Sequence, residues 1–170
     1  GPELSKDISA DEARAGMRLI LDGQVDPVQA AIFLIALRMK RETDDENRGA
    51  LDALRDVTQT VVAPVDDLLD LADPYDGFTR SLPPSPFLPA VLAACGLPTL
   101  SHGVESMGPK YGVTHHQVLR AAGLPVILSS AQAAKRLGEK GVGWAYVDQQ
   151  AFCPKLHQLE LRLDEQDERS

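Results

Sequence analysis

One stretch of the sequence holds several residues that could contact an anion. His102 and Gly103 follow a short apolar run, Leu97–Leu100, and Lys110 and Thr114 lie in the glycine-containing segment that comes next. Backbone N–H groups beside glycine, a helix N-terminus and a lysine ammonium group all suit phosphate or pyrophosphate. We therefore expect part of a ligand site between His102 and Thr114.

Each of these residues also has a structural interpretation. His102 could be a packed histidine at a strand end, Lys110 a solvated loop lysine, and Thr114 the N-cap of the helix that follows. Adjacent histidines on a helix point in different directions, and His115 and His116 have no third ligand at metal-binding spacing. We therefore predict a structural or exposed pair and no metal site.

A second polar segment, Asp73–Pro86, contains Asp76, Gly77, Arg80 and Ser81. The Arg80 guanidinium could donate to a phosphate in a bidentate manner, or it could pair with a nearby aspartate, which is the interpretation we favour. The aspartates in and before this segment could hold a cation, but such a run is more typical of a solvated surface. They are Asp66, Asp67, Asp70, Asp73 and Asp76.

The composition argues against several classes of protein. The chain has 170 residues and a net charge of −8, which makes a nucleic-acid partner a poor match. No apolar run has the length of a transmembrane helix. No nucleophile-elbow, Walker or zinc motif is present.

The cysteines bear on the compartment. Cys95 and Cys153 lie in apolar contexts, so we expect buried free thiols and a reducing compartment. The chain begins Gly1-Pro2, like the scar of a cleaved tag. A targeting segment could therefore have been removed, which leaves the cytoplasm and an organelle stroma or matrix both open.

The elements that position these residues are of two kinds. The first third has helical periodicity throughout, with helices predicted over residues 10–21, 28–39 and 44–62. The second of these helices is apolar on nearly every side, which predicts that it is buried. Short loops between the helices indicate a compact bundle, which ends at Pro64.

The rest of the chain alternates short apolar runs with helices, the pattern of parallel strands in an α/β domain. Strands are predicted near Leu68 and over Leu97–Leu100, Leu124–Leu128 and Val142–Val147. Helices are predicted over residues 87–95, 115–122, 130–140 and 152–165. The expected fold is α plus α/β, with an N-terminal helical bundle in residues 1–64 and a partial parallel-sheet domain in residues 65–170. Ligands of such sheets bind outside the carboxyl ends of the strands, where His102 lies.

The order of these parts resembles a known family. Ile8–Glu46 is similar to the N-terminal helical domain of anthranilate phosphoribosyltransferases and pyrimidine nucleoside phosphorylases, in the glycosyltransferase family 3 superfamily. The segment AACGLPTLSHG, Ala93–Gly103, resembles that family's AACGxxVxKHG segment, and Leu128–Leu159 is similar to its run through GIGFLFAPxFHPAM. The resemblance implies a dimeric enzyme whose α/β domain binds phosphoribosyl pyrophosphate, usually with magnesium, at a glycine-rich loop.

The chain departs from that family at the glycine-rich loop. Where the family has GTGGD followed by FNxST, this chain has DPYDG at 73–77 and FTRSL at 78–82. One glycine remains, Pro74 removes an N–H donor, and the two aspartates would repel pyrophosphate unless a metal intervened. We therefore expect an eroded pyrophosphate loop.

Other family positions are partly kept. His102 and Gly103 match the family's KHGN motif, whereas Ser101 stands where the family has the lysine. Lys110 is kept in the loop that corresponds to SSKSG, and the resemblance carries the family's substrate-side arginine to Arg169. Its acidic magnesium-binding pair would lie beyond Ser170.

Two functions from different classes remain open. The parent protein is either a phosphoribosyltransferase-like enzyme or a non-catalytic protein that keeps the family scaffold to bind a ligand, a protein or nucleic acid. For this chain by itself we expect no catalysis, no catalytic residue and no resident cofactor. The candidate ligand or phosphate contacts are Asp76, Gly77, Arg80, Ser81, His102, Gly103, Lys110, Thr114 and Arg169.

Two expectations concern the whole protein. A naturally short protein is possible, but we favour a fragment or a processed product, because the sequence stops inside the family's continuous pattern. The resemblance also implies a homodimer, with the first and third helices supplying the contact, and a phosphate-containing small molecule as a candidate ligand.

Overall fold

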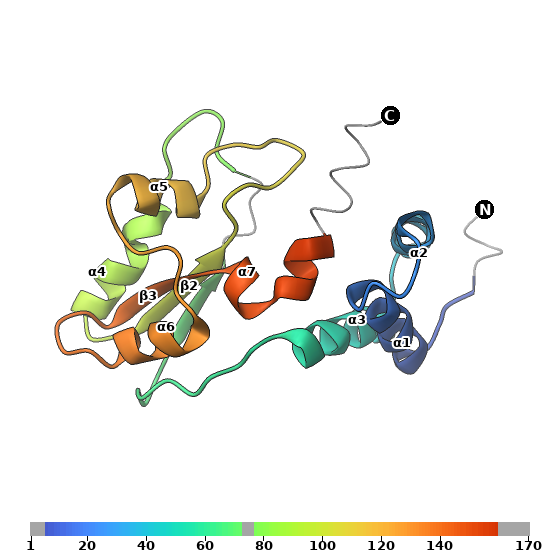
Figure 1. Ribbon diagram of the computed structural model, residues 1–170, viewed down its shortest axis with the longest axis horizontal. Helices are drawn as coiled ribbons and strands as arrows, with labels where there is room; N and C mark the ends of the chain where they lie inside the picture. The colour runs from blue at the N-terminus through green and yellow to red at the C-terminus, as the bar shows by residue number, and fades with distance from the viewer. Residues whose placement is uncertain (1–5, 73–76, 160–170) are drawn as a thin grey trace. The chain divides into compact units, whose positions relative to one another are not determined.

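The computed structural model describes residues 6–72 and 77–159 (Figure 1). The chain forms two compact units. One contains the described residues up to Thr58 and those from Cys153 onward, and the other is Gln59–Phe152. These units and the predicted domains, residues 1–64 and 65–170, do not share their boundaries, because Leu156 and Leu159 pack into the core of the first unit.

The first unit begins with helices α1 (Ala10–Leu21), α2 (Pro27–Lys40) and α3 (Asp44–Val57). Each helix starts with a capping box, in which a side chain accepts from the backbone of the first turn and a Glu or Gln returns the bond. The N-cap residues are Ser9, Asp26 and Thr43.

Helix α3 is shorter than predicted. It ends at Val57 rather than near residue 62, and Thr58 adopts an extended conformation with ψ 130°. The Thr58 hydroxyl donates to the carbonyl of Leu54 at 2.8 Å and satisfies the end of the helix. The helical spacing of apolar residues continues beyond Val57 in the sequence. This spacing does not indicate a local hydrogen bond that ends the helix, so the predicted helix was too long.

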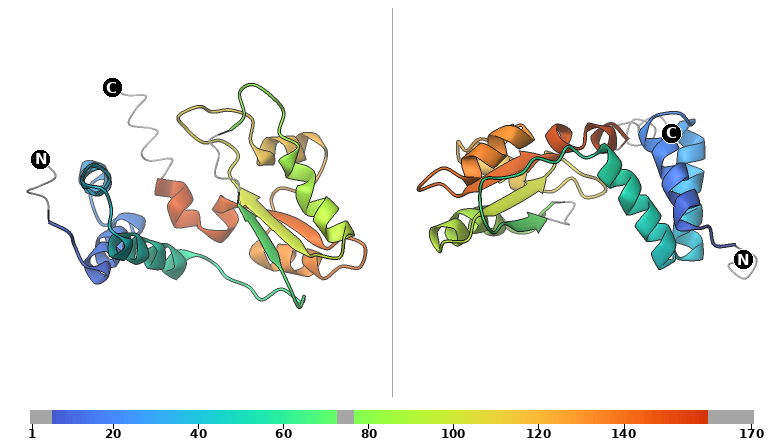
Figure 2. Two further views of the ribbon diagram at one scale, coloured as in Figure 1. Left: turned by 180° about the vertical axis from the view of Figure 1, so that it is seen from behind. Right: turned by 90° about the horizontal axis from the view of Figure 1, so that it is seen from below.

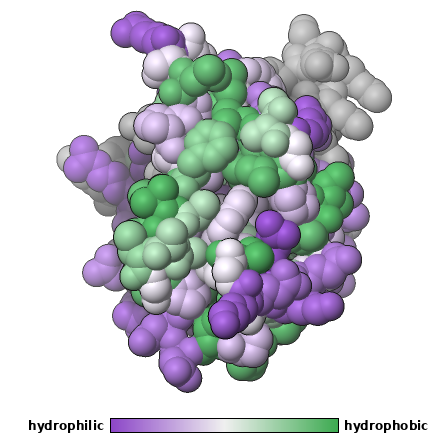
Figure 3. Space-filling model, turned by 90° about the vertical axis from the view of Figure 1, so that its left-hand side faces the viewer, coloured by the Kyte–Doolittle hydropathy of each residue, from purple (hydrophilic) through white to green (hydrophobic). Residues whose placement is uncertain are grey.

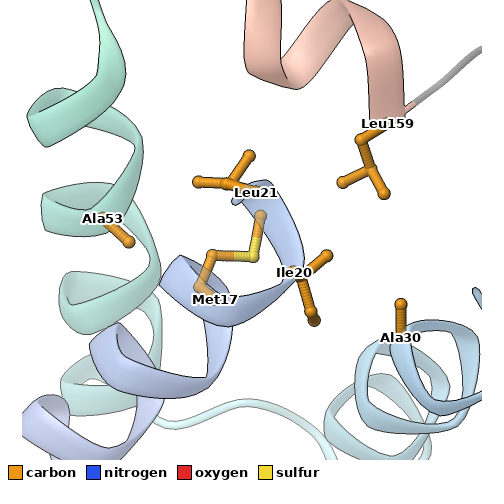
Figure 4. Packing of buried hydrophobic residues seen from close by; sticks show 6 residues of the cluster. All are labelled: Met17, Ile20, Leu21, Ala30, Ala53 and Leu159. Atoms are coloured by element: carbon orange, nitrogen blue, oxygen red, sulfur yellow. The ribbon is translucent and has the colours of Figure 1, made fainter. Parts of the chain in front are cut away.

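The core of the first unit is built around α1. Figure 4 shows Met17, Ile20 and Leu21 of α1 pointing between Ala53 of α3 on one side and Ala30 and Leu159 on the other. Leu159 belongs to a helical segment over residues 154–159. Packing of this segment brings the end of the described chain back to the N-terminal helices.

The prediction that α2 is buried was wrong. Its one buried residue is Ala30, whereas Val28, Ile32, Ile35 and Met39 are 57%, 59%, 55% and 74% exposed. Helical spacing places these four side chains on one face. Hydrophobicity on every side of a helix predicts packing partners on every side, whereas the residues that the structure describes cover α2 on one side.

The second unit contains a three-stranded parallel sheet in the order β1-β2-β3. The strands are β1 (Leu69–Ala72), β2 (Thr99–Gly103) and β3 (Trp144–Asp148). The predicted fold class, a helical bundle followed by a small parallel α/β sheet, is confirmed. Parallel pairing brings the carboxyl ends of all three strands to one edge.

Helices connect the strands. A short 3-10 helix η2 (Ser85–Phe87) and α4 (Leu88–Ala94) precede β2, while α5 (His115–Ala121) and α6 (Ser130–Leu137) lie between β2 and β3. The right panel of Figure 2 shows the sheet between α4 and α6. A last short helix, α7 (Gln149–Phe152), follows β3 directly.

The predicted strand Leu124–Leu128 was wrong. This segment is an irregular connection, and Val126 packs with Leu119 and Tyr146 in a core between α5 and the sheet. Pro125 has no N–H group to donate to a strand ladder, which disfavours a central strand here. β2 therefore pairs with β3 on the side opposite β1, with Ser101 beside Tyr146 and His102 beside Val147.

The two cysteines differ in their exposure to solvent. Cys153 is buried and unpaired as expected, but Cys95 is exposed, which corrects the prediction of two buried thiols.

Phe87 and Val91 are 43% and 57% exposed. Figure 3 shows apolar side chains interrupted by polar ones on the face that it presents. Every helix in the described part of the chain is too short or too polar to cross a membrane.

Candidate functional site

A pocket of about 130 Å³ lies in the second unit, where β2 and β3 end. This is the edge at which ligands of open α/β sheets bind. The pocket combines imidazole, amide and hydroxyl groups with apolar side chains. Its lining residues are His102, Gly103, Val104, Met107, Thr114, His115, Gln149 and Phe152.

His102 lies near the end of β2 and is held from two directions. Its Nε2 atom is 3.2 Å from Oδ1 of Asp70 in the neighbouring strand β1. Its ring meets the ring of Phe152 edge-on, with 5.5 Å between the centroids. The side chain remains 30% exposed. His102 can therefore present an oriented imidazole to the pocket.

Thr114 caps α5 and anchors the preceding loop. Its hydroxyl accepts from the N–H of Gln117 at 3.3 Å and donates to the carbonyl of Glu105 at 3.0 Å. The Arg120 guanidinium donates to the Glu105 carboxylate and lowers the pKa of that carboxyl. The Thr114 hydroxyl proton is therefore already donated within the protein. Its role as the N-cap of α5 accounts for both hydrogen bonds of this buried hydroxyl.

The two histidines at the start of α5 point in different directions, as predicted. His115 faces the pocket, and its Nε2 atom is 2.7 Å from Oγ of Ser85. Its ring stacks on Phe78, with 6.4 Å between centroids and 5° between the planes. His115 is 8% exposed, so the exposed alternative for this pair was wrong.

His116 lies on the other side of the helix start. Its Nδ1 atom is 2.9 Å from Oδ2 of Asp148, the last residue of β3. The side chains of His116 and Asp148 are 3% and 10% exposed. The other oxygen of Asp148 accepts from the N–H of Gln150 at 2.8 Å. One buried carboxylate therefore joins α5, β3 and α7.

A short antiparallel bridge closes the segment that follows β1 onto the loop before α5. Phe78 and Val113 exchange both backbone hydrogen bonds, each at 2.9 Å. Gly77, with φ +101°, lies against Gly112 at this bridge. The N–H groups of Phe78 and Val113 are thus already donated, although glycine-flanked amides of this kind suit an anion.

The structure brings some of the predicted site residues together and separates others. His102, Gly103 and Thr114 share the pocket. Gly77 is buried at the bridge to Gly112. The remaining predicted residues are not in the pocket lining: Arg80, Ser81 and Lys110 are exposed, and Asp76 and Arg169 lie outside the described residues.

Sequence reasoning missed part of the pocket. The sequence predicts a structural or exposed role for His115 and gives no direct sign of a site role for Gln149 or Phe152. His102 lies near the end of β2, and Gln149 directly follows β3. Ligands of parallel sheets bind at the carboxyl ends of the strands, and this rule points to Gln149 as well as to His102. Within residues 6–72 and 77–159, no group of three His, Cys, Asp or Glu side chains is placed to hold a metal.

Comparison with known proteins agrees with this architecture. The helical bundle domain of a glycosyl transferase family matches residues 4–58. Anthranilate phosphoribosyltransferases of Thioalkalivibrio sulfidiphilus (strain HL-EbGR7) and Cellvibrio japonicus (strain Ueda107) are both 34% identical to the chain. These matches cover 89% and 90% of the chain and 42% of each relative.

A solved structure supports the fold. The crystal structure of anthranilate phosphoribosyltransferase (TrpD) from Thermus thermophilus matches 95% of this chain and 49% of its own, with a TM-score of 0.74 and 24% identity. The matches describe a helical bundle of the kind found in a glycosyl transferase family, followed by an α/β unit like that of the solved structure. The sequence and fold matches together support a place for the chain in the anthranilate phosphoribosyltransferase family. It spans 42% of the length of the two curated relatives.

Proposed function

We propose that this chain belongs to a phosphoribosyltransferase-like protein, and that its pocket contributes to binding a phosphate-containing ligand. The observation that carries the proposal is the position of the pocket at the carboxyl ends of β2 and β3, with the family residues His102 and Gly103 in its wall. The 34% identity to anthranilate phosphoribosyltransferases supports phosphoribosyl pyrophosphate as the ligand.

In such a transfer the protein positions the diphosphate and stabilises the charge that develops as it leaves. Here His102 would orient a ligand oxygen, held in place by Asp70 and Phe152. Exposed Lys110 would add a positive charge from the adjoining loop. Within the described residues no group of three His, Cys, Asp or Glu side chains is placed to hold a metal. A magnesium ion would therefore depend largely on the diphosphate oxygens, the usual arrangement when one or two carboxylates complete its ligands.

We further propose that the pyrophosphate loop is eroded and that the chain does not catalyse the reaction by itself. Two features support this proposal. The sequence has DPYDG where the family has a glycine-rich loop, and the next N–H group, of Phe78, is donated to Val113. A diphosphate at this loop would therefore find few free backbone donors.

The alternative is a binding protein without chemistry that keeps the same scaffold. The exposed apolar face of α2 supports a protein partner under either proposal. Val28, Ile32, Ile35 and Met39 expose more than half of their surface, which is unusual for such a row of side chains. We propose that the N-terminal helices form a homodimer. The proposed contact includes this face in addition to α1 and α3.

Calorimetric titration with phosphoribosyl pyrophosphate and magnesium tests the enzyme proposal, on this chain and on the longest natural form of the protein. Micromolar binding that is lost on Lys110→Ala would support it. Lys135→Ala, which removes an exposed lysine of α6, is the matched control and should bind like the unaltered protein. No heat at millimolar ligand with either protein would leave the non-catalytic alternative.

A further inference from the structure

His116 and Asp148 form a buried hydrogen-bonded pair, and each is the sequence neighbour of a pocket residue. We infer that Asp148 fixes His116 in the tautomer with the proton on Nδ1, and that this pair positions the pocket walls formed by His115 and Gln149. The inference rests on the proposed function to the extent that the pocket binds a ligand. The pair itself contacts no ligand, so its members are positioning residues.

The hydrogen bonds determine the tautomer. An ionised aspartate only accepts, so the 2.9 Å contact to Oδ2 requires a proton on Nδ1 of His116. Nε2 of His116 is buried and has no hydrogen-bond partner among the described residues. A second proton on Nε2 would therefore be a buried donor without an acceptor, which is costly. The neutral Nδ1–H form satisfies the one bond that is available.

The surroundings of the pair hold the ring in place. The His116 ring meets the ring of Tyr146 on β3 edge-on, with 5.8 Å between centroids and 86° between planes. Tyr146 is fully buried and is the register partner of Ser101 on β2. Rotation of the His116 ring would lose both this packing and the bond to Asp148.

Each member of the pair is the sequence neighbour of a pocket wall. His116 follows His115, and Asp148 precedes Gln149, and both wall residues are 8% exposed. Asp148 also accepts from the N–H of Gln150 at 2.8 Å, which orients the first turn of α7. The carboxylate thus sets the separation between the start of α5 and the start of α7, and with it the width of the pocket.

Gln149 shows why that width matters. Its side-chain Oε1 atom is buried, lacks a partner in the described part of the chain and belongs to a pocket residue. An acceptor in this position can meet a donor on a ligand only if the opposite wall is at the right distance. The His116–Asp148 pair links the two walls directly and so helps to set that distance.

Nitrogen-15 NMR of the histidine rings tests the inference directly. The chain has four histidines, and His157→Gln in the other unit assists assignment and serves as a control. We expect His116 to be predominantly the Nδ1–H tautomer at neutral pH, the less common neutral form of a free histidine side chain. Observation of the Nε2–H tautomer for His116 would overturn the inference, whatever the variants do.

Two isosteric variants separate positioning from simple packing. In His116→Asn the amide occupies the place of Nδ1 and can still donate to Asp148, whereas in His116→Gln it occupies the place of Nε2 and cannot. We expect the ring signals of His115 and the side-chain amide signals of Gln149 to be kept in His116→Asn and shifted in His116→Gln. Equal shifts in the two variants would contradict a positioning role.

A third variant, Asp148→Asn, is made in case a His116 variant fails to fold. Asp148→Asn has one acceptor oxygen for two donors, His116 Nδ1 and Gln150 N–H, so we expect a mixture of His116 tautomers in a folded protein. Titration of phosphoribosyl pyrophosphate with magnesium then runs on the same samples. If no sample binds it, the proposed function fails while the tautomer and wall signals still decide the inference. If the unaltered protein binds it, equal binding by His116→Asn and His116→Gln would remove the positioning role.

Discussion

Gly77 and Gly112 pack backbone against backbone. A Cβ atom placed on Gly77 would lie 2.3 Å from the carbonyl carbon of Gly112, and one placed on Gly112 would lie 2.5 Å from that of Gly77. No side chain fits at either distance. The contact lets Phe78 and Val113 form their pair of hydrogen bonds, and it holds the segment after β1 against the loop before α5.

The first prediction is that Gly112→Ala opens this bridge. Gly112 lies outside the left-handed region, so the added methyl group acts through its clash with Gly77. We expect a loss of about 1–3 kcal/mol in the free energy of unfolding, measured with denaturant. Hydrogen exchange of the Phe78 and Val113 amides should also become faster.

Gly96→Ala is the matched control for that experiment. A Cβ atom on Gly96 would meet nothing within 4 Å, but its φ of +90° strains an alanine. We expect a cost of about 1–2 kcal/mol from strain alone, with exchange of the Phe78 and Val113 amides unchanged. Faster exchange in both variants would mean that the bridge responds to general destabilisation.

Local signals explain which elements could be predicted from the sequence. Ser9 and Glu12 form the capping box that their spacing indicates, and the start of α1 follows from these two residues. The run at Leu124–Leu128 is apolar enough for a strand, yet it packs as a connection. A short apolar run does not distinguish the two, and here Pro125 was the missed signal.

The candidate site divides in the same way. His102 could be found because the end of a predicted strand is a local feature. The bonds that shape the pocket join residues far apart in sequence: Ser85 to His115, 30 residues away, and His116 to Asp148, 32 residues away. Such pairs leave no periodic pattern, so they became visible only when the strands were placed side by side.

The second prediction concerns acid stability through Glu46. Burial raises the pKa of this carboxyl, but the N–H groups of Ile8 and Thr43 and the ammonium group of Lys40 all donate to it, and together they lower the pKa to about 2. A depressed pKa stabilises the fold above the unfolded value of 4.5. That stabilisation is lost as the pH falls from 4.5 toward 2.

Thermal or denaturant unfolding of Glu46→Gln measures this effect. At pH 7 the variant should be less stable by about 1–3 kcal/mol, because a glutamine leaves one buried donor without an acceptor. The difference from the unaltered protein should shrink on acidification through the same pH window. Asp45→Asn, on the exposed side of the same helix, is the control. A difference that stays constant down to the acid limit would contradict the assigned role of Glu46.

The third prediction tests the proposed homodimer. Ile35→Ser places a hydroxyl on the exposed apolar face of α2 and should convert the dimer to a monomer in sedimentation velocity at tens of micromolar. The stability of the monomer should change little, because Ile35 is already 55% exposed within one chain. Arg38→Ser, on the same helix and 78% exposed at its side chain, should leave the assembly intact. An unaltered protein that sediments as a monomer would refute the homodimer.

The fourth prediction concerns the wall of the pocket at His115. Ser85→Ala removes the 2.7 Å hydrogen bond to Nε2 of His115 and leaves the stacking on Phe78 in place. We expect a loss of about 0.5–1.5 kcal/mol in the free energy of unfolding, the usual worth of one such bond. The ring signals of His115 should broaden in NMR spectra, because one of the restraints on the ring is gone.

Ser106→Ala, at an exposed position in the loop before α5, is the control for that variant and should change neither quantity. If Ser85→Ala loses stability while the His115 signals stay sharp, the bond stabilises η2 rather than the pocket wall. If both stay unchanged, stacking on Phe78 is sufficient to hold the imidazole. In that case the orientation of His115 toward a ligand depends on the segment after β1, and Gly112→Ala should disturb it through the bridge between Phe78 and Val113.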